Sequence, residues 1–121
     1  MLRRFLMLFQ RIDTVFVFVP NLSTAKNWYT NTLELPVLFE DVTNNLIVLK
    51  LGETPLTLLK ADTTYESNRP PHFNFFSENI ETTHSHLRHK GVKVEPIETY
   101  DRMSSFVFYD PFGNKLEVCS F

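Results

Sequence analysis

An internal repeat constrains the fold of this chain more than any other feature of its 121 residues. A strand-like run beginning at Thr14 starts eight positions before a helix-like segment at Leu22. A second run beginning at His72 starts the same eight positions before another helix-like segment at Ile80. The offset between the halves changes by only two residues from one end to the other. Two copies of one supersecondary unit are therefore predicted, within a chain whose length suits a single domain.

Each copy is predicted to contain one strand, one helix and three further strands. Runs of β-branched and aromatic residues indicate the strands, and apolar residues at three-to-four spacing indicate the helices. In the first copy we expect strands over 14–19, 37–41, 46–51 and 56–60 and a helix over 22–32. In the second we expect strands over 72–77, 92–97, 106–109 and 116–119, with a helix over 80–90 that ends at Gly91. The predicted fold class is α+β, with two βαβββ modules.

These modules divide the chain into an arm and a single domain. The arm is residues 1–11 and the domain is residues 12–121, with module one at 12–60, a linker at 61–71 and module two at 72–121. The linker is polar and ends in two prolines, which is typical of a connecting segment. The apolar run at 5–9 is too short for a signal peptide or a membrane span, so we expect the arm to pack on the domain or on a partner subunit.

The C-terminal hairpin carries the most specific motif. Residues 110–117 read DPFGNKLE, with turn residues between two strand-like runs. This run resembles the DPxGNxLE hairpin of the vicinal oxygen chelate superfamily, which includes glyoxalase I, extradiol dioxygenases, and fosfomycin- and bleomycin-resistance proteins. Together with the repeat, the resemblance covers residues 12–121. It implies a half-barrel mixed sheet around a ligand cavity, helices on the outer face, and a homodimer.

The resemblance also implies a set of ligand positions, in the first and last strand of each module. On this chain they fall on Thr14, Thr57, His72 and Glu117. His72 and Glu117 suit zinc, nickel, manganese or iron, whereas threonine hydroxyls bind such ions poorly. Because catalytic metal sites usually have three protein ligands, this set favours a protein without a tightly bound metal. In that case we expect His72 and Glu117 to hydrogen-bond each other.

Strand alternation predicts the rest of the cavity wall on the same face. These residues are Phe16, Phe18, Leu59, Asn74, Phe76, Ser105, Val107, Tyr109 and Cys119. The set is mostly apolar and aromatic, which suits a flat or aromatic ligand, although the phenylalanines could also simply fill the half-barrel. We interpret Cys119 as a small buried apolar residue. His84, His86 and His89 lie on the second helix and are expected on its outer face.

Composition excludes some partners. The formal net charge is −2 and both signs are spread along the chain, which argues against a nucleic-acid partner. The single cysteine suits a reducing compartment, so we expect a cytoplasmic protein with no membrane partner.

Two functions remain open. One is a binding module for a small molecule, similar to bleomycin-resistance proteins. The other is a divalent-metal-dependent glyoxalase- or dioxygenase-like enzyme with His72 and Glu117 as its catalytic metal ligands. Thiol transfer to fosfomycin is the least favoured, because it needs a ligand at the position of Thr14.

Overall fold

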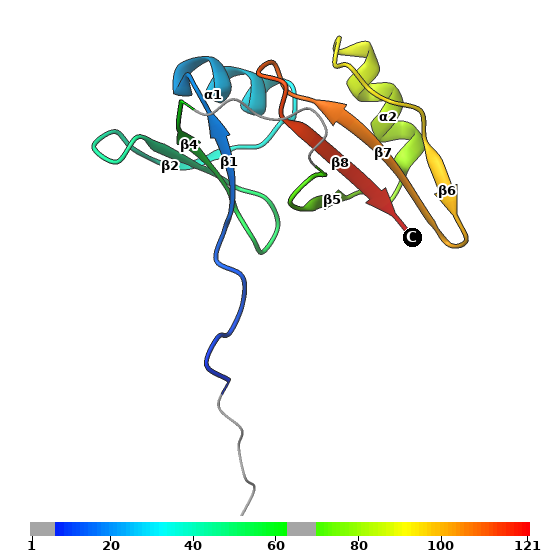
Figure 1. Cartoon of the computed structure of the whole chain (residues 1–121), viewed down its shortest axis with the longest axis horizontal. Helices are drawn as coiled ribbons and strands as arrows, with labels where there is room; N and C mark the ends of the chain where they lie inside the picture. The colour runs from blue at the N-terminus through cyan, green and yellow to red at the C-terminus, as the bar shows by residue number, and fades with distance from the viewer. Residues whose placement is uncertain (1–6, 63–69) are drawn as a thin grey trace, which may run out of the picture.

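The computed structural model describes residues 7–62 and 70–121 of the chain. The arm predicted for 1–11 and the linker predicted for 61–71 therefore lie partly outside the described residues. Residues 7–13 extend away from both sheets (Figure 1), and the side chains of Met7, Leu8 and Phe9 are exposed.

Module one is a four-stranded mixed sheet with one helix. Its elements are β1 (Val15–Val19), α1 (Leu22–Asn31), β2 (Val37–Asp41), β3 (Leu46–Leu49) and β4 (Leu56–Lys60). The strand order is β1-β4-β3-β2, with β1 parallel to β4 and the other pairs antiparallel.

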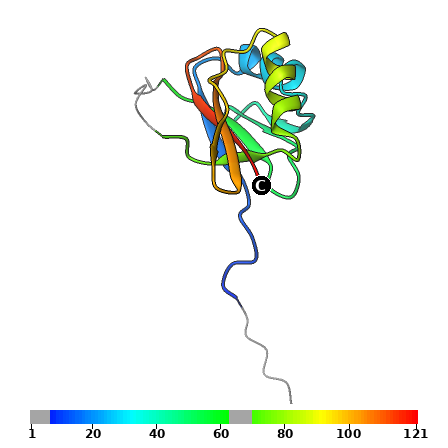
Figure 2. The same cartoon turned by 90° about the vertical axis from the view of Figure 1, so that its right-hand side faces the viewer.

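Module two repeats this topology. Its elements are β5 (Asn74–Phe76), α2 (Ile80–His89), β6 (Glu98–Tyr100), β7 (Met103–Tyr109) and β8 (Lys115–Ser120). The strand order is β5-β8-β7-β6, again with one parallel pair, β5 and β8. The two βαβββ modules confirm the predicted α+β fold class. Both helices lie on the same side of the molecule, with the sheets on the other (Figure 2).

Two predicted strands of module two differ from the structure. In the region predicted as a strand over 92–97, only an isolated bridge between Val94 and Phe108 forms, and strand β6 begins at Glu98. Pro96 interrupts this region, because proline has no N–H to donate to the ladder. Strand β5 begins at Asn74 rather than at His72, which lies in a bend after Pro71.

Local sequence explains where both helices begin and end. The Asn21 side chain accepts a hydrogen bond from the Thr24 amide at 2.9 Å, and Asn79 accepts one from the Thr82 amide at 3.1 Å. Each asparagine thus satisfies an amide that the first helical turn leaves unpaired. Gly91, with φ of +84°, follows α2 in the left-handed conformation that ends many helices.

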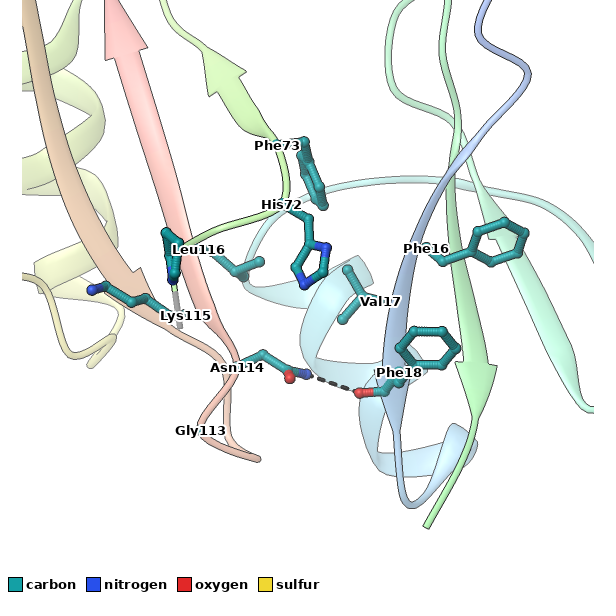
Figure 3. Close-up of a pocket in the computed structure, with 10 residues that line it drawn as sticks. Phe16, Val17, Phe18, His72, Phe73, Gly113, Asn114, Lys115 and Leu116 are labelled. Atoms are coloured by element: carbon teal, nitrogen blue, oxygen red, sulfur yellow. Dashed lines mark hydrogen bonds between the residues drawn. The ribbon is translucent and has the colours of Figure 1, made fainter. Parts of the chain in front are cut away.

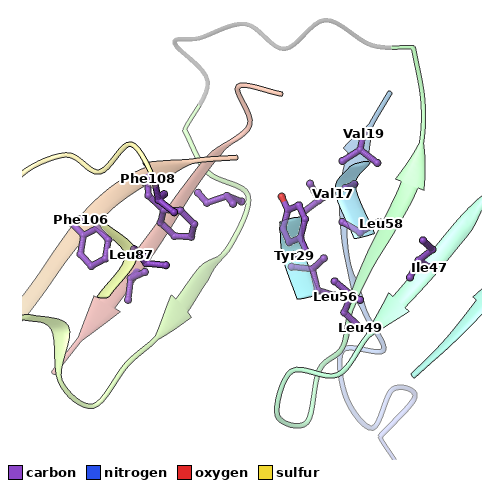
Figure 4. Close-up of a cluster of buried hydrophobic side chains, with 14 of the residues drawn as sticks. Val17, Val19, Tyr29, Ile47, Leu49, Leu56, Leu58, Leu87, Phe106 and Phe108 are labelled. Carbon is purple, nitrogen blue, oxygen red and sulfur yellow. The ribbon is translucent and has the colours of Figure 1, made fainter. Parts of the chain in front are cut away.

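The hydrophobic core lies between the two modules. Figure 4 shows Val17, Tyr29 and Leu58 of module one on one side of the interior and Leu87 and Phe108 of module two on the other. Along β1, buried Val17 and Val19 alternate with exposed Phe16 and Phe18. Each sheet therefore has one face in the core and another face, away from its helix, that we call the helix-free face.

Candidate functional site

The two threonines at ligand positions of module one bond to each other. Thr57 lies on β4 with its Cα paired to that of Phe16, so the two side chains share the helix-free face. The hydroxyl oxygens of Thr14 and Thr57 are 2.7 Å apart, and the Thr14 hydroxyl also donates to the carbonyl of Pro55 at 2.9 Å. These neutral hydroxyls satisfy each other, so module one contributes no strong metal ligand from these positions.

His72 and Glu117, at the corresponding positions of module two, lie apart. His72 lines a cavity of about 50 Å³ beside β1. The side chain of Val17 on β1 points toward the His72 ring (Figure 3). Glu117 lines a separate cavity of about 270 Å³. No hydrogen bond joins these two described side chains, so the expected mutual pair is wrong for the single chain. The physical reason is that pairing with β8 begins only at Asn74, which leaves His72 in a bend free to turn toward β1.

The described residues of the single chain do not assemble a metal centre. Among residues 7–62 and 70–121, no group of three or more histidine, cysteine, aspartate or glutamate side chains is placed to hold a metal ion. His72 and Glu117 line different cavities, whose walls share Lys115.

Strand register groups the remaining candidates on the two helix-free faces. On module one, Phe16 pairs with Thr57 and Phe18 pairs with Leu59. On module two, Asn74, Glu117 and Val107 form one row across β5, β8 and β7, while Phe76, Cys119 and Ser105 form the next. Tyr109 pairs with Lys115 on the same face. In Figure 3, the Lys115 side chain and the rings of Phe16 and Phe18 extend in opposite directions from the cavity around His72.

The cavity around Glu117 contains charged residues that the sequence interpretation missed. Its lining includes Glu95, Glu98 and Lys115 in addition to Val107 and Tyr109. Glu95 fell inside a wrongly predicted strand, and Glu98 followed it. The net negative charge of this short segment was the signal that could have identified them.

The motif residues Asp110 and Asn114 hold the modules together. Asp110 is 5% exposed and accepts four hydrogen bonds, from the Tyr29 hydroxyl, the Asn114 side chain, and the amides of Phe112 and Asn114. The Asn114 side chain also donates to the carbonyl of Phe18 on β1 at 3.0 Å (Figure 3). Burial raises the pKa of Asp110, and the hydrogen bonds from Tyr29 and Asn114 oppose this shift. These two residues therefore act as a clamp between the modules, and Asn114 also lines the cavity around His72.

The three helix histidines have structural partners. The His84 ring packs edge-on against Phe106 and its Nε2 lies 2.9 Å from the carbonyl oxygen of Glu95. His86 contacts Glu34 of module one, and His89 contacts the backbone of its own helix. The sequence predicted all three histidines on the outer face of the helix, whereas His84 is half-buried against its own sheet.

Comparison with protein families identifies the chain. The family model described as "Glyoxalase/Bleomycin resistance protein/Dioxygenase superfamily" matches residues 11–118. The chain belongs to this superfamily. The match covers both modules, so the resemblance inferred from the DPFGNKLE hairpin is confirmed.

Solved structures of similar fold include other members of the superfamily. An integron cassette protein from the mobile metagenome of the Halifax Harbour sewage outfall is 24% identical, with a TM-score of 0.81, and the alignment covers 93% of this chain and 100% of that one. A glyoxalase family protein from Enterococcus faecalis is 28% identical, with a TM-score of 0.76 and coverage of 94% and 100%. An antibiotic-binding protein from Streptomyces is 19% identical, with a TM-score of 0.79 and coverage of 93% and 96%.

Two further results concern curated relatives and membrane-spanning helices. A search of curated proteins found no match to this superfamily member. Among its described residues, no helix has the length and apolar character needed to cross a membrane.

Proposed function

We propose that this superfamily member binds a small apolar or aromatic molecule on its helix-free faces, without a tightly held catalytic metal. The observation that carries the proposal is the set of aromatic rings exposed there. Phe16 is 49% exposed, Phe18 36% and Phe76 54%. Rings of this size are normally buried, and a group of them beside a few polar side chains is typical of a recognition surface.

A second copy of the chain closes the site in this proposal. Ligand pockets bury most of a bound molecule's surface, and an open sheet face does not. A homodimer that sets module one of one copy against module two of the other would cover Phe16 and Phe18 with the face that carries Phe76. Phe39 and Phe121, which are also exposed, would be covered as well.

The chemistry of the ligand positions supports binding over catalysis. A lactoylglutathione lyase from Agrobacterium tumefaciens and the Streptomyces antibiotic-binding protein share this fold at 19% identity, so the fold by itself does not choose between enzyme and binding protein. Thr14 and Thr57 replace two charged or imidazole ligands with neutral hydroxyls that already bond to each other. The alternative is a divalent-metal-dependent glyoxalase- or dioxygenase-like enzyme that uses His72 and Glu117.

The remaining parts of the proposal concern the protein's surroundings. The lone cysteine, Cys119, is buried as a free thiol, which suits a cytoplasmic protein. The small net charge supports a protein with neither a nucleic-acid nor a membrane partner.

Metal analysis separates the two functions. We expect protein purified without chelator to contain far less than one metal ion per chain, and titrations with zinc, nickel, manganese and ferrous iron to show only weak binding, because two ligands hold such ions poorly. Elemental analysis and calorimetry measure this. The variants His72→Ala and Glu117→Ala should leave the low metal content of the purified protein unchanged, as should the control His89→Ala. Near-stoichiometric metal that both variants lose and the control keeps would establish the enzyme alternative instead.

A further inference from the structure

The helix-free face of module two contains a cavity rich in carboxylates. Glu95, Glu98 and Glu117 line this space of about 270 Å³, together with one lysine, Lys115. The apolar part of the wall comes from Pro96, Phe106 and Val107. Glu98 and Ser105 face each other across β6 and β7, while Val107 and Glu117 do so across β7 and β8, so the register brings these side chains to one surface.

These carboxylates form no ion pair among the described residues, although Lys115 lines the same cavity and Lys93 lies over the ring of Tyr109. None of the three is in an ion pair with a lysine, arginine or histidine of residues 7–62 or 70–121; the four ion pairs found there involve Asp13, Glu34 and Glu40. Glu95 accepts a hydrogen bond from the Tyr109 hydroxyl at 3.2 Å, and Glu98 accepts one from Tyr100. These bonds orient two of the carboxylates. Accordingly, the pKa of Tyr100 is raised, mainly by its hydrogen bond to Glu98.

Ser105 provides an independent sign of a ligand. Among residues 7–62 and 70–121 it is one of four buried polar or charged residues, at 6% exposed, and it lines the same cavity. The other three, Thr57, Asp110 and Asn114, each make side-chain hydrogen bonds, whereas the Ser105 hydroxyl has no partner in the described part of the chain. Its oxygen is not sealed in the protein interior, because no fully buried side-chain oxygen or nitrogen there is unpaired. Most of Ser105 is buried while its oxygen opens onto the cavity, so the hydroxyl is available to a molecule bound there.

We infer that this cavity binds a positively charged group of the ligand, an ammonium or a guanidinium. Such a group would donate hydrogen bonds to the carboxylates and to the Ser105 oxygen, and charge-assisted bonds of this kind are the stronger ones. The apolar part of the ligand would lie toward Phe76, whose ring contacts Phe121 with centroids 5.0 Å apart. Phe76 and Ser105 both pair with Cys119, so the two contact regions are neighbours on one face. This inference rests on the proposed function and adds the charge class of the ligand.

Three indole compounds that differ in charge test the inference: cationic tryptamine, neutral 3-methylindole and anionic indole-3-propionate. We expect tryptamine to bind at least about ten-fold more tightly than the other two, with an affinity that falls as salt is added, because salt screens charge attraction. Chemical-shift perturbation in amide NMR spectra measures the affinities and places the contact on β7 and β8. Equal affinities would overturn the inference and leave the proposed function intact. If none of the three compounds binds, both fail.

Variants identify the groups responsible. Glu98→Gln combined with Glu117→Gln should weaken tryptamine binding about ten-fold or more and leave 3-methylindole unaffected. Ser105→Ala, a conservative change, should weaken tryptamine about three-fold. Glu53→Gln, in an exposed turn, is the matched control and should change nothing. If neither cavity variant weakens tryptamine more than the control does, the cation is bound elsewhere and the assignment is wrong.

Discussion

Replacing Asp110 with alanine is expected to lower the free energy of unfolding by about 3 kcal/mol, because it leaves buried donors unpaired. The donors are the Tyr29 hydroxyl, the Asn114 side chain and two backbone amides. Tyr29 belongs to module one and Asp110 to module two, so the substitution also removes a bond between modules. Urea unfolding, followed by the fluorescence of Trp28, measures the loss.

Asp41→Ala is the matched control. Asp41 also caps a turn, through two hydrogen bonds from Asn44, but this turn is at the surface between β2 and β3. We expect a much smaller loss there, because water can replace the missing acceptor. Equal losses in the two variants would show that Asp110 is only a turn cap.

The pH dependence of stability gives a second measurement of Asp110. Burial raises its pKa in the folded protein above the unfolded value, so the folded state binds the proton more tightly. The contribution of Asp110 to stability therefore increases as the pH falls through the raised pKa, and it levels off below the ordinary aspartate value of about 4. Asp110→Asn cannot titrate at this position. The difference in unfolding free energy between the wild type and this variant should therefore grow as the pH falls from neutral to about 4. A difference that shrinks or stays constant would contradict the burial argument.

Phe16→Asp is expected to raise the dissociation constant of the proposed homodimer at least about 100-fold, because it places a charge in its apolar interface. The side chain is 49% exposed in the single chain, so the folded monomer should tolerate the change. Sedimentation equilibrium measures the dissociation constant, and circular dichroism checks that the fold is retained.

Val42→Asp is the control for this prediction. Val42 is 83% exposed in the turn between β2 and β3, so the same charge is added to an apolar surface outside the helix-free face. It should leave the dimer intact. A wild-type chain that is monomeric at all concentrations tested, or a Phe16→Asp variant that associates like the wild type, would show that the second copy does not cover this face.

Local sequence was sufficient for most of the fold. The repeat, the strand-like runs and the capping asparagines act over a few neighbouring residues, so their structural consequences follow from short-range chemistry. The prediction failed where a single residue changed the hydrogen-bond pattern, as Pro96 does in the region expected to be a strand over 92–97. It also failed at His72, since the bend after Pro71 keeps this residue out of strand β5.

The family, the two βαβββ modules and the alternation that puts Phe16, Phe18 and Phe76 on helix-free faces could all be predicted from the residues in order. The contacts of those positions came from the tertiary structure. It paired Thr14 with Thr57, separated His72 from Glu117, and joined Tyr29 to Asp110 across the modules. These outcomes depend on how two modules meet, and contacts between residues distant in the chain leave no periodic pattern in the sequence.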